Sequence, residues 1–239
     1  RLRRTLAAAL VLAVAVAFAP VMLPLAVALT VVFALGTLLA RGSLATAGWS
    51  LVAGLGASLG AAVLNFPWIT SWTWEGIVGA PPVGEPGLGL VSLASFEIGR
   101  TDFAALAIAL FLPVISAVLL ARAWRLTWAV RSALMVLVFG ALAMLADQGS
   151  WPIDPPQVGV LLVPVAVGVA ISAAAALAAF DLDVRGGNFG WRQPLGILST
   201  VAVVVGLAPG LAALAHGSFQ APSTPLARLL DASLPAASS

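Results

Sequence analysis

The sequence contains no cysteine and a single histidine, and only 8% of its 239 residues are charged. Without cysteine, disulfides, thiolate metal sites and cysteine nucleophiles are excluded. His216 has no second histidine or nearby acid in sequence with which to form a metal site or a catalytic triad. Soluble domains carry about 25% charged residues. We therefore expect no complete soluble catalytic domain, no metal site and no cofactor in this chain.

The chain is instead rich in apolar residues. Hydrophobic residues make up 62% of it, against roughly 45–50% in a soluble domain. All eleven basic residues are arginines, the net charge is only +2, and the arginines lie between apolar runs rather than in one patch. Such spacing indicates membrane orientation and excludes a nucleic-acid partner. The composition predicts an all-α, polytopic transmembrane bundle.

The apolar runs divide into about seven membrane spans of the usual length, roughly 17–25 residues each. Residues 5–40 would be about 54 Å long as one helix, which is too long for a bilayer. Pro20 and Pro24 lie in the middle of this run and predict a hairpin of two spans. The predicted spans are residues 5–19, 22–40, 44–65, 103–121, 132–146, 158–180 and 194–215.

These spans predict one transmembrane domain, residues 1–215, with an extracytoplasmic loop at 66–102 and an extracytoplasmic tail at 216–239. The chain begins at Arg1 without a methionine, and we expect it to be a piece of a longer polypeptide. In the third span, small residues recur at positions 54, 56, 58 and 60, a pattern that favours close helix contact.

The distribution of charge predicts the orientation. If the chain crosses the membrane seven times, nine arginines and two acids lie on one side, and two arginines and seven acids lie on the other. Cytoplasmic loops carry excess arginine, so we expect a multi-pass plasma-membrane protein with a cytoplasmic N-terminus and an extracytoplasmic C-terminus. No tryptophan falls in the middle of a predicted span: four lie at predicted inner ends and four in outer segments, and amphipathic indole rings favour the headgroup level.

One candidate site is the basic, aromatic connector around Arg122, Arg125 and Arg131, which also contains Trp124 and Trp128. Arginine binds phosphate in a bidentate manner, so this segment predicts a site for lipid phosphate, such as that of a polyprenyl-phosphate-linked sugar. The alternative is that these residues serve only orientation and ordinary lipid anchoring.

The loop at 66–102 contains the second candidate site. Indole rings stack on sugars and carboxylates accept hydroxyl protons, so a general base in this loop would lie near the outer end of the fourth span. Alternatively, the acids have no function and Asp102 simply caps the helix that follows. The candidate catalytic residues are Asp102, Glu97 and Arg100, and the candidate substrate-binding residues are Trp68, Trp72 and Trp74.

Asp181 and Asp183 form a D-x-D pattern of the kind that holds a metal-bound diphosphate in many nucleotide-sugar transferases. Here the two acids follow an alanine-rich membrane helix rather than a strand of a nucleotide-binding sheet. They are therefore interpreted as part of a solvated turn, in which Asp183 pairs with Arg185.

The run from Phe180 to Pro194, Phe-Asp-Leu-Asp-Val-Arg-Gly-Gly-Asn-Phe-Gly-Trp-Arg-Gln-Pro, and the Asn65-Phe-Pro-Trp68 exit from the third span give a resemblance. The chain resembles the membrane region of large actinobacterial glycosyltransferases with a family 2 catalytic domain. The resemblance implies that a cytoplasmic nucleotide-sugar domain precedes this region in the same polypeptide. This chain has no such domain, so no active-site residue of the family is carried over.

Two functions are therefore expected. The first is a membrane-embedded region of a cell-envelope glycosyltransferase, which scaffolds or assists transfer of sugar to or from a lipid-linked carrier. The alternative is a transporter or flippase module for envelope lipid or polymer. Ion-coupled transporters usually carry ionisable groups inside their spans, and the predicted spans contain none.

The predicted orientation is tested by cysteine labelling, since the chain has no cysteine of its own. Cysteines introduced at Gly84 and Ser150 should react with a membrane-impermeant thiol reagent applied to intact cells, because both loops are predicted to be extracytoplasmic. A cysteine at Gly187 should react only after the cells are permeabilised. Labelling at Gly187 in intact cells would contradict the orientation.

Overall fold

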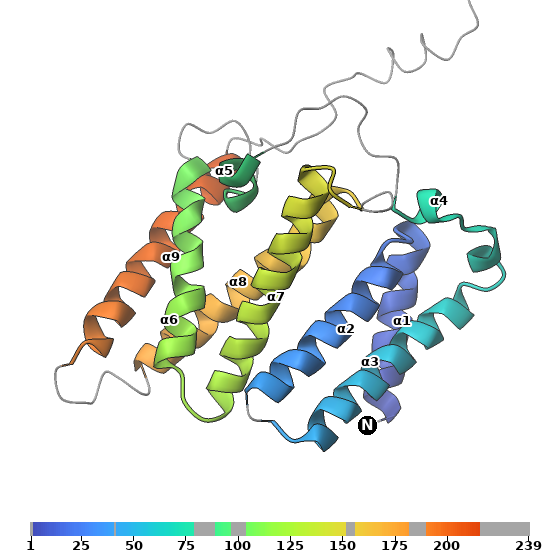
Figure 1. Ribbon diagram of the computed structural model, residues 1–239, viewed down its shortest axis with the longest axis horizontal. Helices are drawn as coiled ribbons and strands as arrows, with labels where there is room; N and C mark the ends of the chain where they lie inside the picture. Colours follow the sequence, from blue (N-terminus) through green and yellow to red (C-terminus); the bar gives the residue numbers. More distant parts are fainter. Residues whose placement is uncertain are drawn as a thin grey trace, which may run out of the picture.

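The computed structural model describes residues 2–40, 42–78, 89–96, 104–151, 156–181 and 190–215, and this part of the chain is helical without strands (Figure 1). The elements in chain order are α1 (Leu2–Phe18), α2 (Met22–Leu39), α3 (Leu44–Leu64), the 3₁₀ helix η1 (Trp68–Ser71), α4 (Trp74–Val78), α5 (Gly89–Ala94), the 3₁₀ helix η2 (Ala104–Phe111), α6 (Leu112–Leu120), α7 (Trp124–Asp147), α8 (Val158–Ala179) and α9 (Arg192–Ala215). The tail at 216–239 lies outside the described residues.

The long helices run up and down the bundle, so that their ends gather at two levels (Figure 1). We call the first level the arginine end, because it carries Arg3, Arg4, Arg122, Arg125 and Arg192. The short elements η1, α4 and α5 lie at the opposite end.

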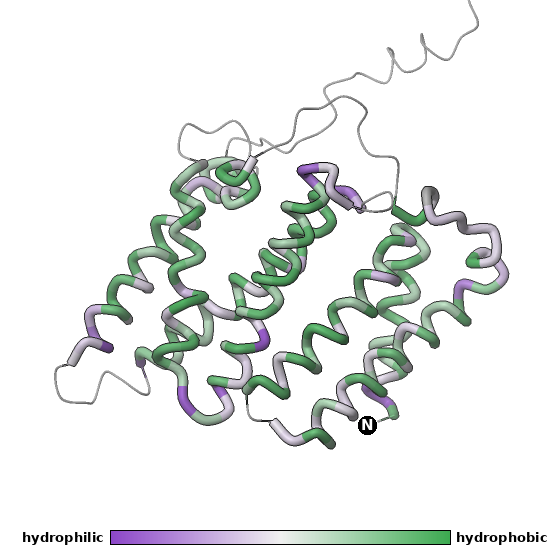
Figure 2. The backbone as a smooth tube through the Cα atoms, viewed as in Figure 1, coloured by the Kyte–Doolittle hydropathy of each residue, from purple (hydrophilic) through white to green (hydrophobic). Residues whose placement is uncertain are grey.

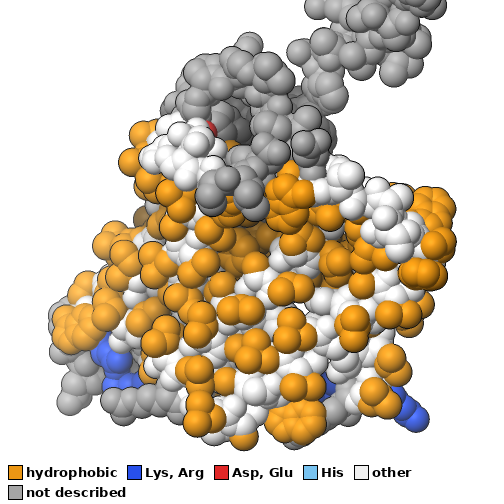
Figure 3. Space-filling view, turned by 45° about the vertical axis from the view of Figure 1, so that its right-hand side comes forward, with side chains coloured by type: hydrophobic (Ala, Val, Ile, Leu, Met, Phe, Trp, Pro, Cys, Tyr) orange, Lys and Arg blue, Asp and Glu red, His pale blue; other side chains and the backbone are white. Residues whose placement is uncertain are grey.

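Within the described residues, five helices, α2, α3, α7, α8 and α9, are long and apolar enough to cross a membrane. The sequence predicted about seven spans. The helices at the other two predicted spans are shorter than these five: α1 has 17 residues, and the fourth predicted span contains the apolar helical stretch Ala105–Leu120. Hydrophobic residues predominate along the helices between the two ends (Figure 2), and apolar side chains are widespread on the face shown in Figure 3. This arrangement indicates a helical membrane protein.

Helices α1, α2 and α3 form a three-helix group in which α3 packs against both of the others. Pro20 lies in the tight turn between α1 and α2, as its position in the apolar run predicted. The close contact predicted for the third span is confirmed, because a Cβ at Gly54 would overlap Thr30 of α2, and one at Gly60 would meet Ala9 of α1 at 3.0 Å.

Helices α6 to α9, together with η2, form a second group, in which α7 and α8 share the largest contact. Two buried serine pairs join its helices: Ser172 donates to Ser132 between α8 and α7, and Ser116 donates to Ser199 between α6 and α9, both at 2.8 Å. Interhelical hydrogen bonds and small residues are common means of helix association in an apolar environment.

The main contact between the two groups is the packing of α2 against α7. Near the C-terminus of α2, Arg131 donates two hydrogen bonds to the Thr37 hydroxyl, from Nε at 3.0 Å and from Nη2 at 2.8 Å. Its guanidinium carbon lies 4.6 Å from the ring centre of Phe33 and 5.3 Å from that of Trp128. We call the residues Phe33, Gly36, Thr37, Trp128 and Arg131 the α2–α7 seam.

Two charged side chains also tie helix ends together. Arg192, at the start of α9, donates to the Leu119 carbonyl at 2.9 Å and thus places a cation at the C-terminus of α6, where the helix dipole favours it. At the opposite end, the Asp147 carboxylate accepts a hydrogen bond from the Gly89 backbone N–H at 3.1 Å. These contacts fix the ends of α6 and α5 against their neighbours.

Candidate functional site

The candidate site lies at the arginine end, where the chain turns from α6 into α7. The connector is only three residues long, and its last residue, Ala123, has a φ of 52°, in the left-handed region that residues other than glycine rarely adopt. This sharp turn puts Trp124 and Arg125 in the first turn of α7. Trp128 follows at the four-residue spacing that places two side chains on the same helix face.

The facing wall is the C-terminal half of α8. Ile171, Ala174, Ala175 and Ala178 are spaced so that they share one face of the helix. Farther from the arginine end the two helices pack tightly, since a Cβ at Gly168 would lie 2.9 Å from the Ser132 carbonyl oxygen. Near the arginine end mainly short alanine side chains oppose the tryptophans, and the space between the helices stays open.

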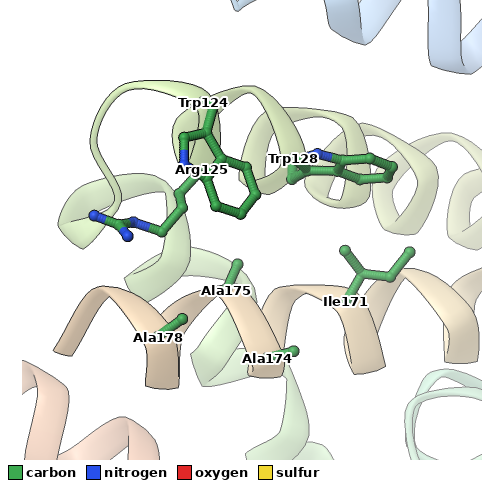
Figure 4. Close-up of a pocket in the computed structure, with 7 residues that line it drawn as sticks. All are labelled: Trp124, Arg125, Trp128, Ile171, Ala174, Ala175 and Ala178. Atoms are coloured by element: carbon green, nitrogen blue, oxygen red, sulfur yellow. The ribbon is translucent and has the colours of Figure 1, made fainter. Parts of the chain in front are cut away.

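The result is a cavity of about 370 Å³ lined by Trp124, Arg125, Trp128, Ile171, Ala174, Ala175 and Ala178. Figure 4 shows the two indole rings extending from α7 over α8, while Arg125 extends toward the α8 end that carries Ala178. The interior is therefore apolar, and the charge lies at one side of the opening.

The cavity has one cationic side chain in its lining. Arg125 is the only charged side chain among the seven lining residues, and its guanidinium carbon lies 5.9 Å from the Trp124 ring centre. No side chain caps the N-terminus of α7, where the helix dipole places partial positive charge. An apolar cavity with a cationic opening suits an amphipathic ligand that carries a phosphate.

The three arginines of the predicted lipid-phosphate site fall into different places. Arg125 lines the cavity, and Arg122 is exposed in the connector before it. Arg131 does not line the cavity, because its side chain is directed to Thr37 and Phe33 of α2. The prediction that no apolar span contains an ionisable group needs correction here: α7 begins at Trp124, so Arg131 lies inside one of the five long apolar helices.

The predicted outer site is described only in part. Trp68 and Trp74 are exposed at the opposite end, in η1 and at the start of α4, and Trp72 between them is half-buried. Candidate catalytic residues Glu97, Arg100 and Asp102 lie outside the described residues. The element α4, which begins at Trp74, lies at the opposite end of the bundle from the start of α7 (Figure 1).

Among the described residues no group of three or more histidine, cysteine or acidic side chains is placed to hold a metal ion. Of the D-x-D pair, Asp181 follows the end of α8, and Asp183 lies outside the described residues. Sequence reasoning missed the α8 wall of the cavity. The available signal was the alanine-rich stretch 173–179, whose small side chains leave space opposite a large residue.

Comparison with known proteins adds no relative. No protein-family model matches the chain, and no curated protein or solved structure is significantly similar to it.

Proposed function

We propose that this chain is the membrane-embedded region of a cell-envelope glycosyltransferase, and that the α7–α8 cavity holds the phosphate end of a polyprenyl-phosphate carrier. The enzyme class comes from the sequence resemblance described above. The ligand class is inferred from the lining of the cavity, which combines two indole rings, an alanine-rich wall and a single arginine.

Each part of the cavity has a matching part in such a ligand. The isoprenoid chain is apolar and fits against Ile171 and the alanines of α8, where its burial is favourable. The phosphate is an anion, and the Arg125 guanidinium can bind it through two parallel hydrogen bonds. The cavity lies at a bundle end rather than in the middle, which is the level of lipid headgroups in a membrane.

We further propose that seven segments cross the membrane, with the arginine end in the cytoplasm. A 3₁₀ helix rises about 2.0 Å per residue and an α-helix 1.5 Å. The eight residues of η2 and nine of α6 together reach about 30 Å, which matches the hydrocarbon thickness. With α1, which is about 25 Å long, the count becomes seven. The excess of arginine at one end supports the orientation.

A transporter or flippase module is the other candidate, and Arg131 is the feature that bears on it. Ionisable residues inside membrane helices often mark a transport pathway. Arg131, however, is engaged by the Thr37 hydroxyl and two aromatic rings at a helix–helix contact, and it does not open into the cavity. This environment favours a structural role for the charge and therefore the glycosyltransferase proposal.

The lipid site is tested by binding to the purified chain in phosphatidylcholine nanodiscs. A polyprenyl phosphate should bind saturably and at least about tenfold more tightly than the matching polyprenol, because a hydrogen bond to a charged group contributes about 1.5–3 kcal/mol. Arg125→Gln should remove that difference and leave polyprenol binding unchanged. Ala175→Leu, which fills the cavity, should weaken both ligands.

Arg3→Gln is the matched control, because Arg3 is an exposed arginine of α1 at the same end of the bundle. It should bind both lipids as the unmodified chain does. Equal affinities for the phosphate and the alcohol, or equal effects of Arg125→Gln and Arg3→Gln, would contradict a phosphate site in the cavity. Binding of inorganic phosphate alone with the same affinity would show that the lipid chain contributes nothing.

The predicted catalytic role of the outer loop is tested separately, in cells. Asp102→Asn is nearly isosteric and removes a base whose contribution is typically 10²- to 10⁴-fold. We expect envelope glycan to fall by at least about tenfold at equal protein level. A fall of less than about threefold would exclude Asp102 as the general base.

A further inference from the structure

One wall of the cavity is shared with the α2–α7 seam. Trp128 lines the cavity, and the same side chain contacts Phe33 of α2 and Arg131 of its own helix. The Phe33 and Trp128 rings meet edge to face, with centres 5.5 Å apart and planes at 72°, which is a favoured aromatic geometry. Trp128 therefore separates the seam from the cavity.

The cavity side gives the Trp128 indole little restraint. The α8 residues that oppose the tryptophans are mainly alanines, and 39% of the Trp128 surface is exposed. A large ring opposite small side chains can adopt several rotamers unless another contact selects one. The contacts that select one come from the other side, where Phe33 and Arg131 lie.

Arg131 is itself held in one orientation by the Thr37 hydroxyl of α2. The Thr37 side chain is buried, and its hydroxyl donates to the Phe33 carbonyl at 2.8 Å. Because a hydroxyl has one proton and two lone pairs, this bond leaves the Thr37 oxygen as an acceptor for the Nε–H and Nη2–H of Arg131. The guanidinium then lies against both aromatic rings, where a cation is attracted to the ring face.

We propose that Arg131 is a positioning residue for the lipid site: held by Thr37, it fixes the Trp128 indole as a wall of the α7–α8 cavity without touching the ligand. The inference rests on the proposed function of that cavity. It assigns to α2, which contributes no lining residue, an indirect influence on lipid affinity through Trp128. It also separates the two arginines by role, with Arg125 binding the phosphate and Arg131 shaping the apolar wall.

The separation of roles gives a specific expectation. Because Trp128 forms part of the apolar wall, disturbing it should weaken a polyprenol and the matching polyprenyl phosphate by the same factor. Thr37→Val removes the acceptor of Arg131 with almost no change in shape, and we expect it to lower both affinities roughly threefold to tenfold, the range of a cation–π contact. Thr37→Ser keeps the hydroxyl and should restore both.

A second readout follows the ring itself. In protein labelled with 5-fluorotryptophan, the ¹⁹F resonance of Trp128 is assigned by its loss in Trp128→Phe. Thr37→Val should shift or broaden this resonance, and Thr37→Ser should leave it in place. Thr30→Val is the matched control: Thr30 also lies on α2 and donates to a carbonyl four residues earlier, but it faces Gly54 of α3 instead of α7. It should change neither readout.

Three outcomes would overturn the inference. An unchanged Trp128 resonance in Thr37→Val would show that the seam does not hold the ring. A shifted resonance with unchanged affinities would show that the ring position does not matter for binding. Loss of affinity for the phosphorylated lipid alone would show that Arg131 acts on the phosphate directly. If the unmodified chain binds neither lipid, the proposed function fails, while the ¹⁹F resonance still reports independently on the seam.

Discussion

The fold depends on how an arginine is accommodated within a long apolar helix. An unpaired guanidinium in such surroundings would be strongly unfavourable, and Arg131 lies eight residues into α7. Its charge is satisfied by the Thr37 hydroxyl and the Phe33 ring of α2 and by the Trp128 ring of its own helix. Thr37 lies 94 positions earlier in the chain. This requirement brings α2 and α7 together at one register. Gly36 allows the approach, because a Cβ there would lie 2.9 Å from the Arg131 Cα.

From this seam the rest of the arrangement follows outward. On one side of the seam, α2 packs against α3, which packs against α1, and glycines of α3 allow both contacts. On the other side, α7 packs against α8, and α6 and α9 complete the second group. The cavity forms on the α8 side of α7, next to the ring that the seam restrains. Structure and proposed function thus share one residue, Trp128, which packs in the seam and lines the site.

The helices themselves could be predicted from sequence, because long uncharged runs have few stable alternatives in a membrane, and Pro20 marks a turn that the structure contains. The start of α7 could not be predicted from sequence. Hydropathy placed it after Arg131, whereas the helix begins eight residues earlier, at Trp124, and its first turns include Trp128 and Arg131, which contact Phe33 of α2. The cavity was only half predictable: the arginines and tryptophans of the connector were evident, but α8 is apolar on all sides, so its sequence does not indicate which face meets α7. The 3₁₀ geometry of η2 had no sequence signal either.

The most direct test of this account is a matched pair of glycine substitutions measured by reversible unfolding in detergent micelles. Gly36→Ala adds a methyl group where α2 meets the Arg131 backbone, and overpacking of this kind typically costs about 1–3 kcal/mol. Gly140→Ala makes the same change in α7 at a position with no atom within 4 Å, and should be neutral or slightly stabilising because alanine favours helix. Only Gly36→Ala should therefore lower the unfolding free energy. Equal stabilities of the two variants would contradict the seam as the contact that joins the two helical groups.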